Sequence, residues 1–390
     1  MEVKVLKLDH LGNGIAKNDG KVIFIKRALK DEIVDISISE DRKNYQVGLI
    51  KEFKVKSKDR IDVICPYYDE CGGCDFLHTK KDVEIDFKKN KGLDLINSPL
   101  NFYDTKEYHY RNKVTLHVKE QKIGFYKEKS NSIIDIKYCY LLDEKINYVL
   151  EQLNNYIKEN ILEIDEIMIR VDNEIMMHIK GKIDDKFINT FNFVDTILVN
   201  NKVLKGRGFI EKQIMDFKFK ISPNSFFQVN DKGLECIFNI LKENLHRKYH
   251  KALDLYSGTS VMGILISNFC NEVISIESNK DATNDALTNI KLNNIKNIKV
   301  INDKVENVID KLNGIDLIIV DPPRKGMDKK TIDYIKRIKP ETLIYISCNM
   351  ITLKRDLEFL KEDYSIKEFN LVNMFPKTYH VESVIILDLK

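Results

Sequence analysis

The chain has 390 residues, of which 43% are hydrophobic and 32% charged, and its formal net charge is +3. This length allows two or three domains with separate cores, and the composition is typical of a globular protein without an apolar run that could span a bilayer. The small net charge permits a nucleic-acid partner without indicating one. Residues 1–7 alternate and carry charge throughout, so we expect no signal peptide or transit sequence, a cytoplasmic location and no membrane partner.

The first 55 residues contain short alternating stretches that are separated by turn residues. Asn18-Asp19-Gly20 is typical of a β-hairpin, and the whole segment predicts a small β-barrel. The next segment, to about residue 215, mixes a cysteine-bearing loop with amphipathic strands within residues 112–126 and a helix near residues 144–161.

Seven cysteines with uneven spacing are more typical of ligands or nucleophiles than of disulfides in a reducing compartment. Cys65, Cys71, Cys74 and the distant Cys139 offer four soft ligands for a metal centre. Their spacing does not separate tetrahedral zinc from an iron–sulfur cluster, and His78 could replace Cys139 in a zinc site. From the residues alone zinc is favoured. Two further cysteines, Cys236 and Cys270, are predicted to be core residues on helices.

From about residue 250 apolar strands alternate regularly with amphipathic helices up to the C-terminus. Strands that are apolar on both faces, with helices between them, predict an α/β fold with a doubly wound, mostly parallel sheet. Ligands of such sheets bind beyond the carboxyl ends of the strands.

The first of these strands is followed by a glycine-containing turn, Tyr256-Ser257-Gly258, which would let the backbone approach a ligand closely. The second strand ends at Glu277, where a carboxylate can accept both hydroxyls of a ribose. A nicotinamide dinucleotide and S-adenosylmethionine both suit this pattern. Ser260 stands where the dinucleotide fingerprint has its middle glycine, which favours S-adenosylmethionine.

Two later strands also end in chemically active residues. Asp321 precedes two prolines, Pro322 and Pro323, which force an extended exit from the sheet and hold the carboxylate at the strand tip. Cys348 ends the neighbouring strand just before a helix, whose N-terminal partial charge is expected to lower the pKa of the thiol. This placement favours a nucleophile over a buried structural thiol.

Five segments in order along the chain resemble the RNA (uracil-5-)-methyltransferase family, in particular its 23S rRNA branch. They are the N-terminal barrel, which resembles a TRAM domain, and the motifs "CPYYDECGGC", "SPNSFFQVN", "DPPRKG" with "LIYISCNMIT", and "NMFPKTYHVE". The resemblance implies a TRAM-like, RNA-binding β-barrel at 1–55, a central domain with an iron–sulfur site at 56–215, and a class I Rossmann-like methyltransferase domain at 216–390.

The resemblance also implies residue roles. The thiolate of Cys348 would attack C6 of uracil, because C5 is too weak a nucleophile to take a methyl group directly, and Glu382 would later remove the C5 proton. The cofactors implied are S-adenosylmethionine and a [4Fe–4S] cluster held by the four cysteines named above. The expected contacts of the methyl donor are Gln228, Tyr256, Gly258, Glu277 and Asp321. Asn373 and Lys377 depart from the family's second signature.

The resulting hypothesis is a monomeric enzyme that makes 5-methyluridine in 23S rRNA. The same chemistry on a tRNA uridine is the nearest alternative, and a non-catalytic RNA-binding assembly factor is the alternative from another class. The target base must leave its stack to reach the crevice. Tyr108, Tyr110, Arg111 and Lys113 are candidate RNA contacts, although a strand with a solvated basic face explains them equally well.

Overall fold

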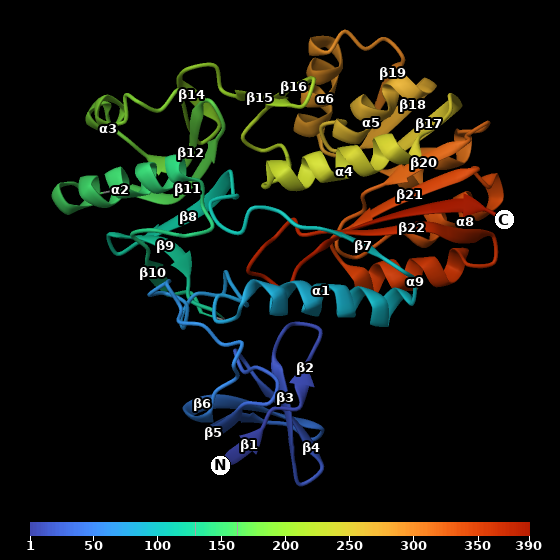
Figure 1. The fold of residues 1–390 in the computed structure, drawn as a ribbon. Helices are drawn as coiled ribbons and strands as arrows, with labels where there is room; N and C mark the ends of the chain where they lie inside the picture. The colour runs from blue at the N-terminus through green and yellow to red at the C-terminus, as the bar shows by residue number, and fades with distance from the viewer. Residues whose placement is uncertain (129, 162) are drawn as a thin grey trace. The chain divides into compact units, whose positions relative to one another are not determined.

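The computed structural model describes residues 1–128, 130–161 and 163–390 and divides into two compact units (Figure 1). The N-terminal unit comprises Met1–Asp94 and Lys377–His380, and the C-terminal unit comprises Leu95–Pro376 and Val381–Lys390. The predicted division into three domains, at 1–55, 56–215 and 216–390, is not tested by these two units and stays a prediction. No helix in the described part of the chain has the length and apolarity needed to cross a membrane.

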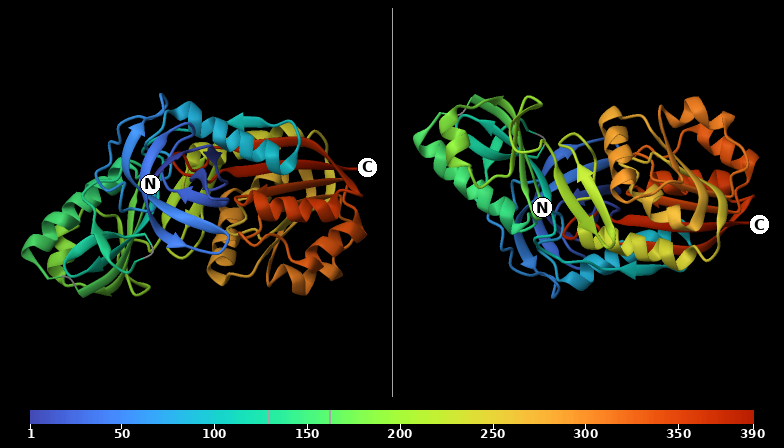
Figure 2. Two further views of the ribbon diagram at one scale, coloured as in Figure 1. Left: turned by 90° about the horizontal axis from the view of Figure 1, so that it is seen from below. Right: turned by 90° about the horizontal axis from the view of Figure 1, so that it is seen from above.

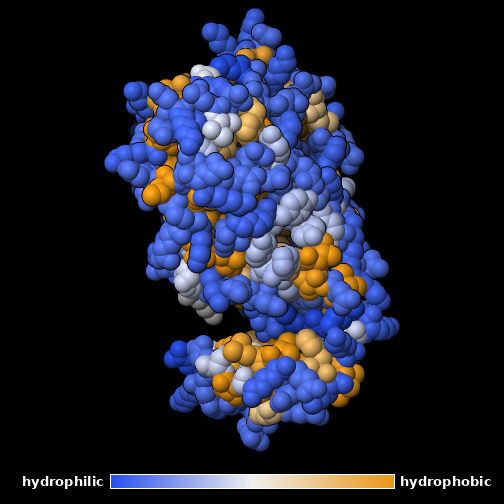
Figure 3. Space-filling model, turned by 90° about the vertical axis from the view of Figure 1, so that its left-hand side faces the viewer, coloured by the Kyte–Doolittle hydropathy of each residue, from blue (hydrophilic) through white to orange (hydrophobic). Residues whose placement is uncertain are grey.

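A six-stranded sheet in the order β1-β5-β6-β4-β3-β2 opens the N-terminal unit. Its strands are β1 (Glu2–Lys4), β2 (Lys7–Leu8), β3 (Gly14–Asn18), β4 (Lys21–Ile25), β5 (Ile33–Asp41) and β6 (Tyr45–Val55). The predicted hairpin is confirmed: Asn18 pairs with Lys21, and Asp19 and Gly20 have φ values of 48° and 79°. Alternate apolar side chains form a small core, and others are exposed on the surface of the sheet (Figure 3).

Helix α1 (Lys81–Ile96) follows the cysteine-bearing loop and is absent from the sequence-based prediction. Its buried positions are Glu84, Lys88 and Gly92, which are spaced four residues apart and therefore share one helix face. Because this inward face carries two charges and a glycine, the apolar periodicity that normally identifies a helix is missing.

The C-terminal unit begins with a short strand of the large sheet, β7 (Asn101–Tyr103), and continues with a seven-stranded sheet in the order β10-β9-β8-β11-β12-β13-β14. Its strands are β8 (Lys113–Lys119), β9 (Lys122–Tyr126), β10 (Ile133–Asp135), β11 (Glu163–Val171), β12 (Ile175–Lys182), β13 (Thr196–Val199) and β14 (Lys202–Lys205). Helices α2 (Glu144–Glu159) and α3 (Asp185–Thr190) belong to this part. The strands and helix predicted within residues 112–126 and 144–161 are thus confirmed.

A hairpin of β15 (Ile210–Ile214) and β16 (Phe217–Ile221) leads into an eight-stranded sheet, ordered β19-β18-β17-β20-β21-β23-β22-β7. Its other strands are β17 (Tyr249–Leu255), β18 (Cys270–Glu277), β19 (Ile298–Asn302), β20 (Leu317–Val320), β21 (Thr342–Ser347), β22 (Tyr364–Val372) and β23 (Glu382–Leu389). The strands from β19 to β21 are parallel, and β23 runs antiparallel to β21 and β22. The predicted mostly parallel sheet is confirmed.

Helices cover both faces of this sheet (Figures 1 and 2). One face packs against α4 (Asp231–Asn244), α5 (Val261–Ile266) and α6 (Lys280–Leu292), and the other against α7 (Val305–Val308), α8 (Lys329–Ile338) and α9 (Met350–Leu360). One cysteine prediction is wrong in part: Cys270 is buried, but it opens strand β18, because the preceding helix has already ended in a short 3₁₀ turn. Cys236 lies on α4 as predicted.

Candidate active site

Three predicted site residues meet at one edge of the eight-stranded sheet. Asp321 directly follows β20, and Cys348 directly follows β21, two parallel strands that lie side by side. In the antiparallel pair of β21 and β23, Ser347 lies opposite Ser383, so the next residues along the two strands are Cys348 and Glu382. The register alone therefore places a thiol and two carboxyl groups at the carboxyl ends of the parallel strands, where ligands of such sheets bind.

The surroundings of Cys348 raise the pKa of its thiol to about 11. Burial is the main cause, the carboxyl groups of Glu382 and Asp321 add to it, and Arg324 acts in the opposite direction. The predicted lowering of this pKa by the following helix is therefore wrong. The N-terminus of α9 is capped by Asn349, whose side chain accepts the backbone N–H of Ile351. Burial of the thiol, together with the two carboxyl groups, outweighs the partial charge of this helix end.

The carboxyl groups of this edge hold their protons more tightly than exposed ones. Burial raises the pKa of Glu382, and Asp321 raises it further by charge repulsion. Burial and the nearby Asp254 raise the pKa of Asp321 in the same way. Asp254, within β17, is itself buried and has a pKa of about 7. Closely spaced carboxyl groups with raised pKa values are typical of sites that accept and release protons.

The turn after β17 has an unusual backbone. Tyr256, Gly258 and Ser260 all have positive φ values, of 61°, 53° and 58°. A tyrosine and a serine in this left-handed region are uncommon and cost some conformational energy, which is a frequent feature of functional turns. The Tyr256 hydroxyl lies 3.2 Å from the hydroxyl of Thr331 on α8, which fixes the position of the ring.

Glu277 meets the same turn from the neighbouring strand. One carboxylate oxygen accepts the backbone N–H of Gly258 at 3.0 Å, and the other accepts that of Asn279 at 2.7 Å. Apart from its two chain neighbours, no described residue has an atom within 4 Å of the position where a Cβ on Gly258 would stand, so the backbone of this turn is open to a ligand. The turn and the carboxylate fit the ribose and the close backbone approach of an S-adenosylmethionine site, and the individual contacts stay predictions.

Asp254 supports this turn through hydrogen bonds to the residues around it. The sequence did not single it out. Its carboxyl group accepts the N–H of Gly263 at 2.9 Å and the hydroxyl of Ser275 at 3.2 Å. A Cβ on Gly263 would approach Ser260, Ser275 and Asp254 to within 2.8 Å, so only glycine fits here. The position of Asp254 within a buried strand was the available signal, since an aspartate there needs polar partners.

Gln228 lies in the segment before α4, which is held in place by its neighbours. The backbone N–H of Asn112 donates to the Val229 carbonyl at 3.0 Å, and the Asn112 side chain reaches the Gln228 carbonyl at 3.4 Å. Asn230 caps α4 by accepting the N–H of Gly233. Asn112 is a second residue that the sequence did not single out, because its partners are more than 110 residues away in the chain.

The four predicted metal ligands are divided between the two units. Cys65, Cys71 and Cys74 belong to the N-terminal unit and Cys139 to the C-terminal unit. Within residues 1–128, 130–161 and 163–390, no group of three or more His, Cys, Asp or Glu side chains is arranged to hold a metal ion. The described residues therefore do not supply a formed ligand set for the cluster.

The alternative zinc ligand His78 is buried, and its Nδ1 lies 2.6 Å from the hydroxyl of Tyr68. Burial lowers the pKa of this imidazole to about 3, so it stays neutral. One ring nitrogen is thus already engaged in a hydrogen bond within the N-terminal unit.

The candidate RNA contacts around β8 differ in accessibility. Tyr110 is buried, and its hydroxyl donates to the Pro376 carbonyl at 3.0 Å, so its ring is part of the core. Tyr108 lies edge-on to Tyr140 with ring centroids 6.4 Å apart. Lys113 is half-buried, and burial with nearby guanidinium groups lowers its pKa to about 8. Tyr108, Arg111 and Lys113 are all partly exposed, so the structure leaves these three as the more accessible candidates.

Both departures from the family's second signature are buried side chains. Asn373 donates from its amide to Asp104 at 2.8 Å, and Lys377 lies beside Glu84. They precede Glu382 in the loop between β22 and β23.

Comparison with known proteins agrees with this geometry. A protein-family model described as tRNA (Uracil-5-)-methyltransferase matches residues 87–390, and a TRAM domain model matches residues 1–48. A protein of Clostridium acetobutylicum named as an uncharacterized RNA methyltransferase is 33% identical over 444 residues, which cover 99% of this chain and 96% of that protein. A similarly named protein of Caldanaerobacter subterraneus is 32% identical over 441 residues, covering 99% and 97%.

Among solved structures, the Pyrococcus abyssi tRNA (uracil-54, C5)-methyltransferase in complex with S-adenosyl-L-homocysteine superimposes with a TM-score of 0.83 at 26% sequence identity. The superposition covers 99% of this chain and 100% of that one. Since the family match spans most of the chain, and the relatives align over nearly its whole length, the chain belongs to the tRNA (uracil-5-)-methyltransferase family and carries an N-terminal TRAM domain.

Proposed function

We propose that the protein transfers a methyl group from S-adenosylmethionine to C5 of a uridine in RNA, which gives 5-methyluridine. The observation that carries this proposal is the meeting of Cys348, Glu382 and Asp321 at the strand ends, on the same sheet edge as the Gly258 turn and Glu277. Family membership supports RNA uracil as the substrate class and S-adenosylmethionine as the methyl donor.

Cys348 is the proposed nucleophile. After its thiol releases a proton to solvent, the sulfur forms a bond with C6 of uracil, and the electron pair of the C5=C6 double bond moves to give C5 carbanion character. S-adenosylmethionine, when bound, supplies an electrophilic methyl group for C5. Tyr256, Gly258, Glu277, Gln228 and Asp321 are the residues proposed to hold this donor.

Glu382 is the proposed base that completes the reaction. Its carboxylate takes the C5 proton, the C–H electron pair restores the C5=C6 double bond, and the bond between C6 and sulfur breaks to release the Cys348 thiolate. A carboxylate with a raised pKa is a stronger base than an exposed one, so the burial of Glu382 suits this step. Without it the enzyme would stay covalently attached to RNA.

For the RNA itself, we retain a uridine of 23S rRNA as the proposed target and a tRNA uridine as the alternative. The rRNA proposal comes from the cysteine-bearing loop, whereas the similarity to a tRNA methyltransferase structure favours tRNA. Mass mapping of 5-methyluridine in rRNA and tRNA from a deletion strain separates the two, because only the true target loses the modification. The monomeric state and the cytoplasmic location also stay predictions.

The [4Fe–4S] cluster remains a proposal that depends on the spacing of Cys65, Cys71, Cys74 and Cys139 and on the resemblance. Iron and sulfide analysis of anaerobically prepared protein tests it directly. Four iron atoms per chain are expected, whereas zinc without iron would overturn the cluster in favour of the zinc interpretation.

A non-catalytic RNA-binding assembly factor is the alternative from another class. The presence of both Cys348 and Glu382 argues against it, because binding alone needs neither a nucleophile nor a base at these strand ends.

The two proposed catalytic residues are tested by the steps that they carry. Cys348→Ala should abolish tritium release from RNA containing 5-³H-uridine, and Glu382→Gln should accumulate a protein–RNA adduct that survives denaturing electrophoresis. Cys236→Ala, which removes a partly buried thiol from α4, and Glu358→Gln, on the exposed face of α9, serve as matched controls and should keep wild-type activity.

Tritium release by Cys348→Ala would disprove the covalent mechanism. A wild-type protein that modifies no RNA, while binding it, would favour the assembly factor.

A further inference from the structure

The loop that leads into Glu382 runs from Asn373 to Val381, between β22 and β23. Its first part is fixed within the C-terminal unit. The Thr105 hydroxyl donates to the Asn373 carbonyl at 2.7 Å, and the Asn373 amide donates to Asp104 at 2.8 Å. These bonds hold the beginning of the loop.

Two further hydrogen bonds continue this attachment. The Asn230 amide donates to the Met374 carbonyl, and the Tyr110 hydroxyl donates to the Pro376 carbonyl, both at 3.0 Å. Asn230 also caps α4, directly after the segment that carries Gln228. The loop is therefore held at three successive places before it leaves this unit.

The next four residues, Lys377–His380, belong to the N-terminal unit by their contacts, and the chain returns to the C-terminal unit at Val381. The carbonyl of Lys377 accepts the backbone N–H groups of Asp75 and Phe76 at 2.8 and 3.1 Å. The N–H of Tyr379 donates to the Asp75 carboxylate at 3.1 Å. Hydrogen bonds thus attach this part of the loop to Asp75 and Phe76, which directly follow the cysteine-bearing motif.

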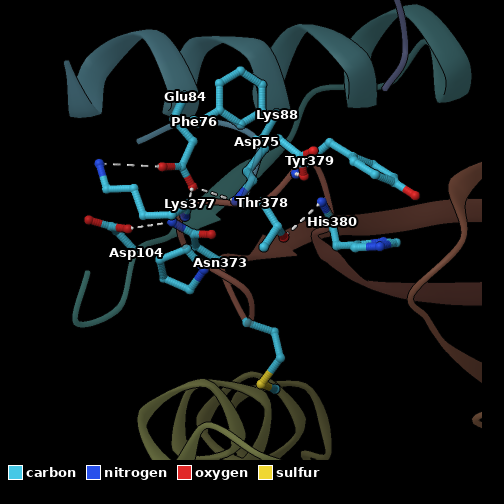
Figure 4. A network of polar contacts seen from close by, with 12 residues as sticks. Asp75, Phe76, Glu84, Lys88, Asp104, Asn373, Lys377, Thr378, Tyr379 and His380 are labelled. Carbon is cyan, nitrogen blue, oxygen red and sulfur yellow. Dashed lines mark hydrogen bonds and ion pairs between the residues drawn. The ribbon is translucent and has the colours of Figure 1, made fainter. Parts of the chain in front are cut away.

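Helix α1 adds a buried ionic group to this attachment (Figure 4). Glu84 accepts the backbone N–H of Lys377 at 2.9 Å, its carboxylate lies 2.6 Å from Nζ of Lys88, and Nζ of Lys377 lies 3.9 Å from it. All three side chains are at most 1% exposed. Lys377 also adopts a positive φ of 66°, a conformation that a lysine keeps only where its surroundings hold it.

We propose that Glu84, Lys88 and Lys377 are positioning residues for Glu382: they hold the loop at its far point, so that strand β23 starts with the carboxyl group aligned for removal of the C5 proton. This inference rests on the proposed function. Only Val381 separates the held segment from Glu382, so a movement of Lys377–His380 is transmitted along the backbone to the base.

The proposal makes one step of the reaction sensitive to this ionic group. Glu382 acts after methyl transfer, when its carboxylate takes the C5 proton and the bond between C6 and the Cys348 sulfur breaks. A base displaced by about 1 Å loses roughly two orders of magnitude in rate. The covalent adduct should then accumulate although its formation is unimpaired.

The test uses the full-length protein, S-adenosylmethionine and RNA that the wild type methylates. Glu84→Gln keeps an oxygen to accept the N–H of Lys377 but removes the charge. It should lower kcat by about tenfold or more, raise the fraction of enzyme trapped on RNA several-fold, and leave the KM for S-adenosylmethionine unchanged. Lys377→Gly tolerates the positive φ, removes the ammonium group, and should behave alike.

Asp86→Asn is the matched control, because it makes the same change of charge on the exposed face of α1 and should behave as wild type. Glu84→Gln and Lys377→Gly with wild-type kcat and adduct fraction would overturn the proposal. It would also be overturned if both variants lost S-adenosylmethionine binding together with activity, since the group would then serve only folding. A wild type without methyltransferase activity would refute the proposed function instead.

Discussion

Two groups of buried carboxyl side chains in this chain have opposite electrostatic surroundings. Glu84 in the N-terminal unit lies 2.6 and 3.9 Å from the ammonium groups of Lys88 and Lys377. Glu382 in the C-terminal unit has Asp321 as its charged neighbour, and Asp321 has Asp254. One carboxylate is compensated by cations, whereas burial and neighbouring carboxyl groups raise the pKa values of the others.

The difference separates a structural role from a chemical one. A buried carboxylate beside two lysines is compensated by their ammonium groups and fixes the position of the chain around it. Buried carboxyl groups beside each other destabilise their charged forms, which lowers stability but gives groups that take up and release protons. Costs of this kind are typical of functional sites rather than of a core.

The largest expected effect is on the reactivity of Cys348, which should depend steeply on pH if its surroundings raise the pKa of the thiol. Because its pKa is about 11, its thiolate fraction should rise about tenfold per pH unit between pH 7 and 10. Alkylation by iodoacetamide, followed on the Cys348 peptide by mass spectrometry, should therefore accelerate by roughly three orders of magnitude over this range.

Asp321→Asn provides the control for that measurement, because it removes one of the negative charges that raise the thiol pKa. Its alkylation at pH 8 should be faster than that of the wild type. An alkylation rate that levels off below pH 9 in the wild type would show an ordinary thiol and contradict the electrostatic account of this edge.

The structural role of Glu84 is tested by the free energy of unfolding. Glu84→Ala leaves the buried ammonium groups of Lys88 and Lys377 without this carboxylate, which should lower the free energy of unfolding by about 3–5 kcal/mol. Urea unfolding followed by circular dichroism measures this loss, since the chain has no tryptophan. Asp86→Ala should change it by less than about 0.5 kcal/mol; equal effects of the two substitutions would refute the structural role.

The remaining prediction concerns Asp254. Its pKa rises from the ordinary value of about 4 to about 7 in the folded protein. The folded state therefore binds the extra proton, and the stability that Asp254 contributes at low pH is lost as the pH rises from about 4 to 7. Because asparagine is neutral at every pH, Asp254→Asn should raise the free energy of unfolding at pH 8, and by less at pH 5. A gain of the same size at both pH values would contradict this.

Much of the fold could be predicted because local pattern and final structure agree. The alternation of apolar strands and amphipathic helices after residue 250 is confirmed element by element, and so is the hairpin at Asp19-Gly20. Helix α1 was missed because its inward residues, Glu84 and Lys88, are charged. Periodicity identifies a helix only when its buried face is apolar.

The candidate site was likewise predicted only in part. Strand order and the placement of polar residues at strand ends were sufficient to select Glu277, Asp321 and Cys348 from the sequence. Asp254 was missed because its partners, Gly263 and Ser275, belong to a later helix and a neighbouring strand. The pKa of Cys348 was predicted in the wrong direction, since the sequence shows the following helix but neither the burial of the thiol nor the carboxyl groups that the sheet brings beside it.

By itself, then, the amino-acid sequence determined the strand and helix alternation and the family resemblance, and it selected Cys348 as the proposed nucleophile, because these depend on short-range pattern and residue type. Only the tertiary structure decided the raised pKa of the Cys348 thiol, the hydrogen bond of Asp254 that supports the proposed cofactor turn, and the burial of Lys377 beside Glu84. Electrostatic interactions depend on the distance between groups and on their exclusion from water. Both quantities arise only when residues that are far apart in the chain are packed together.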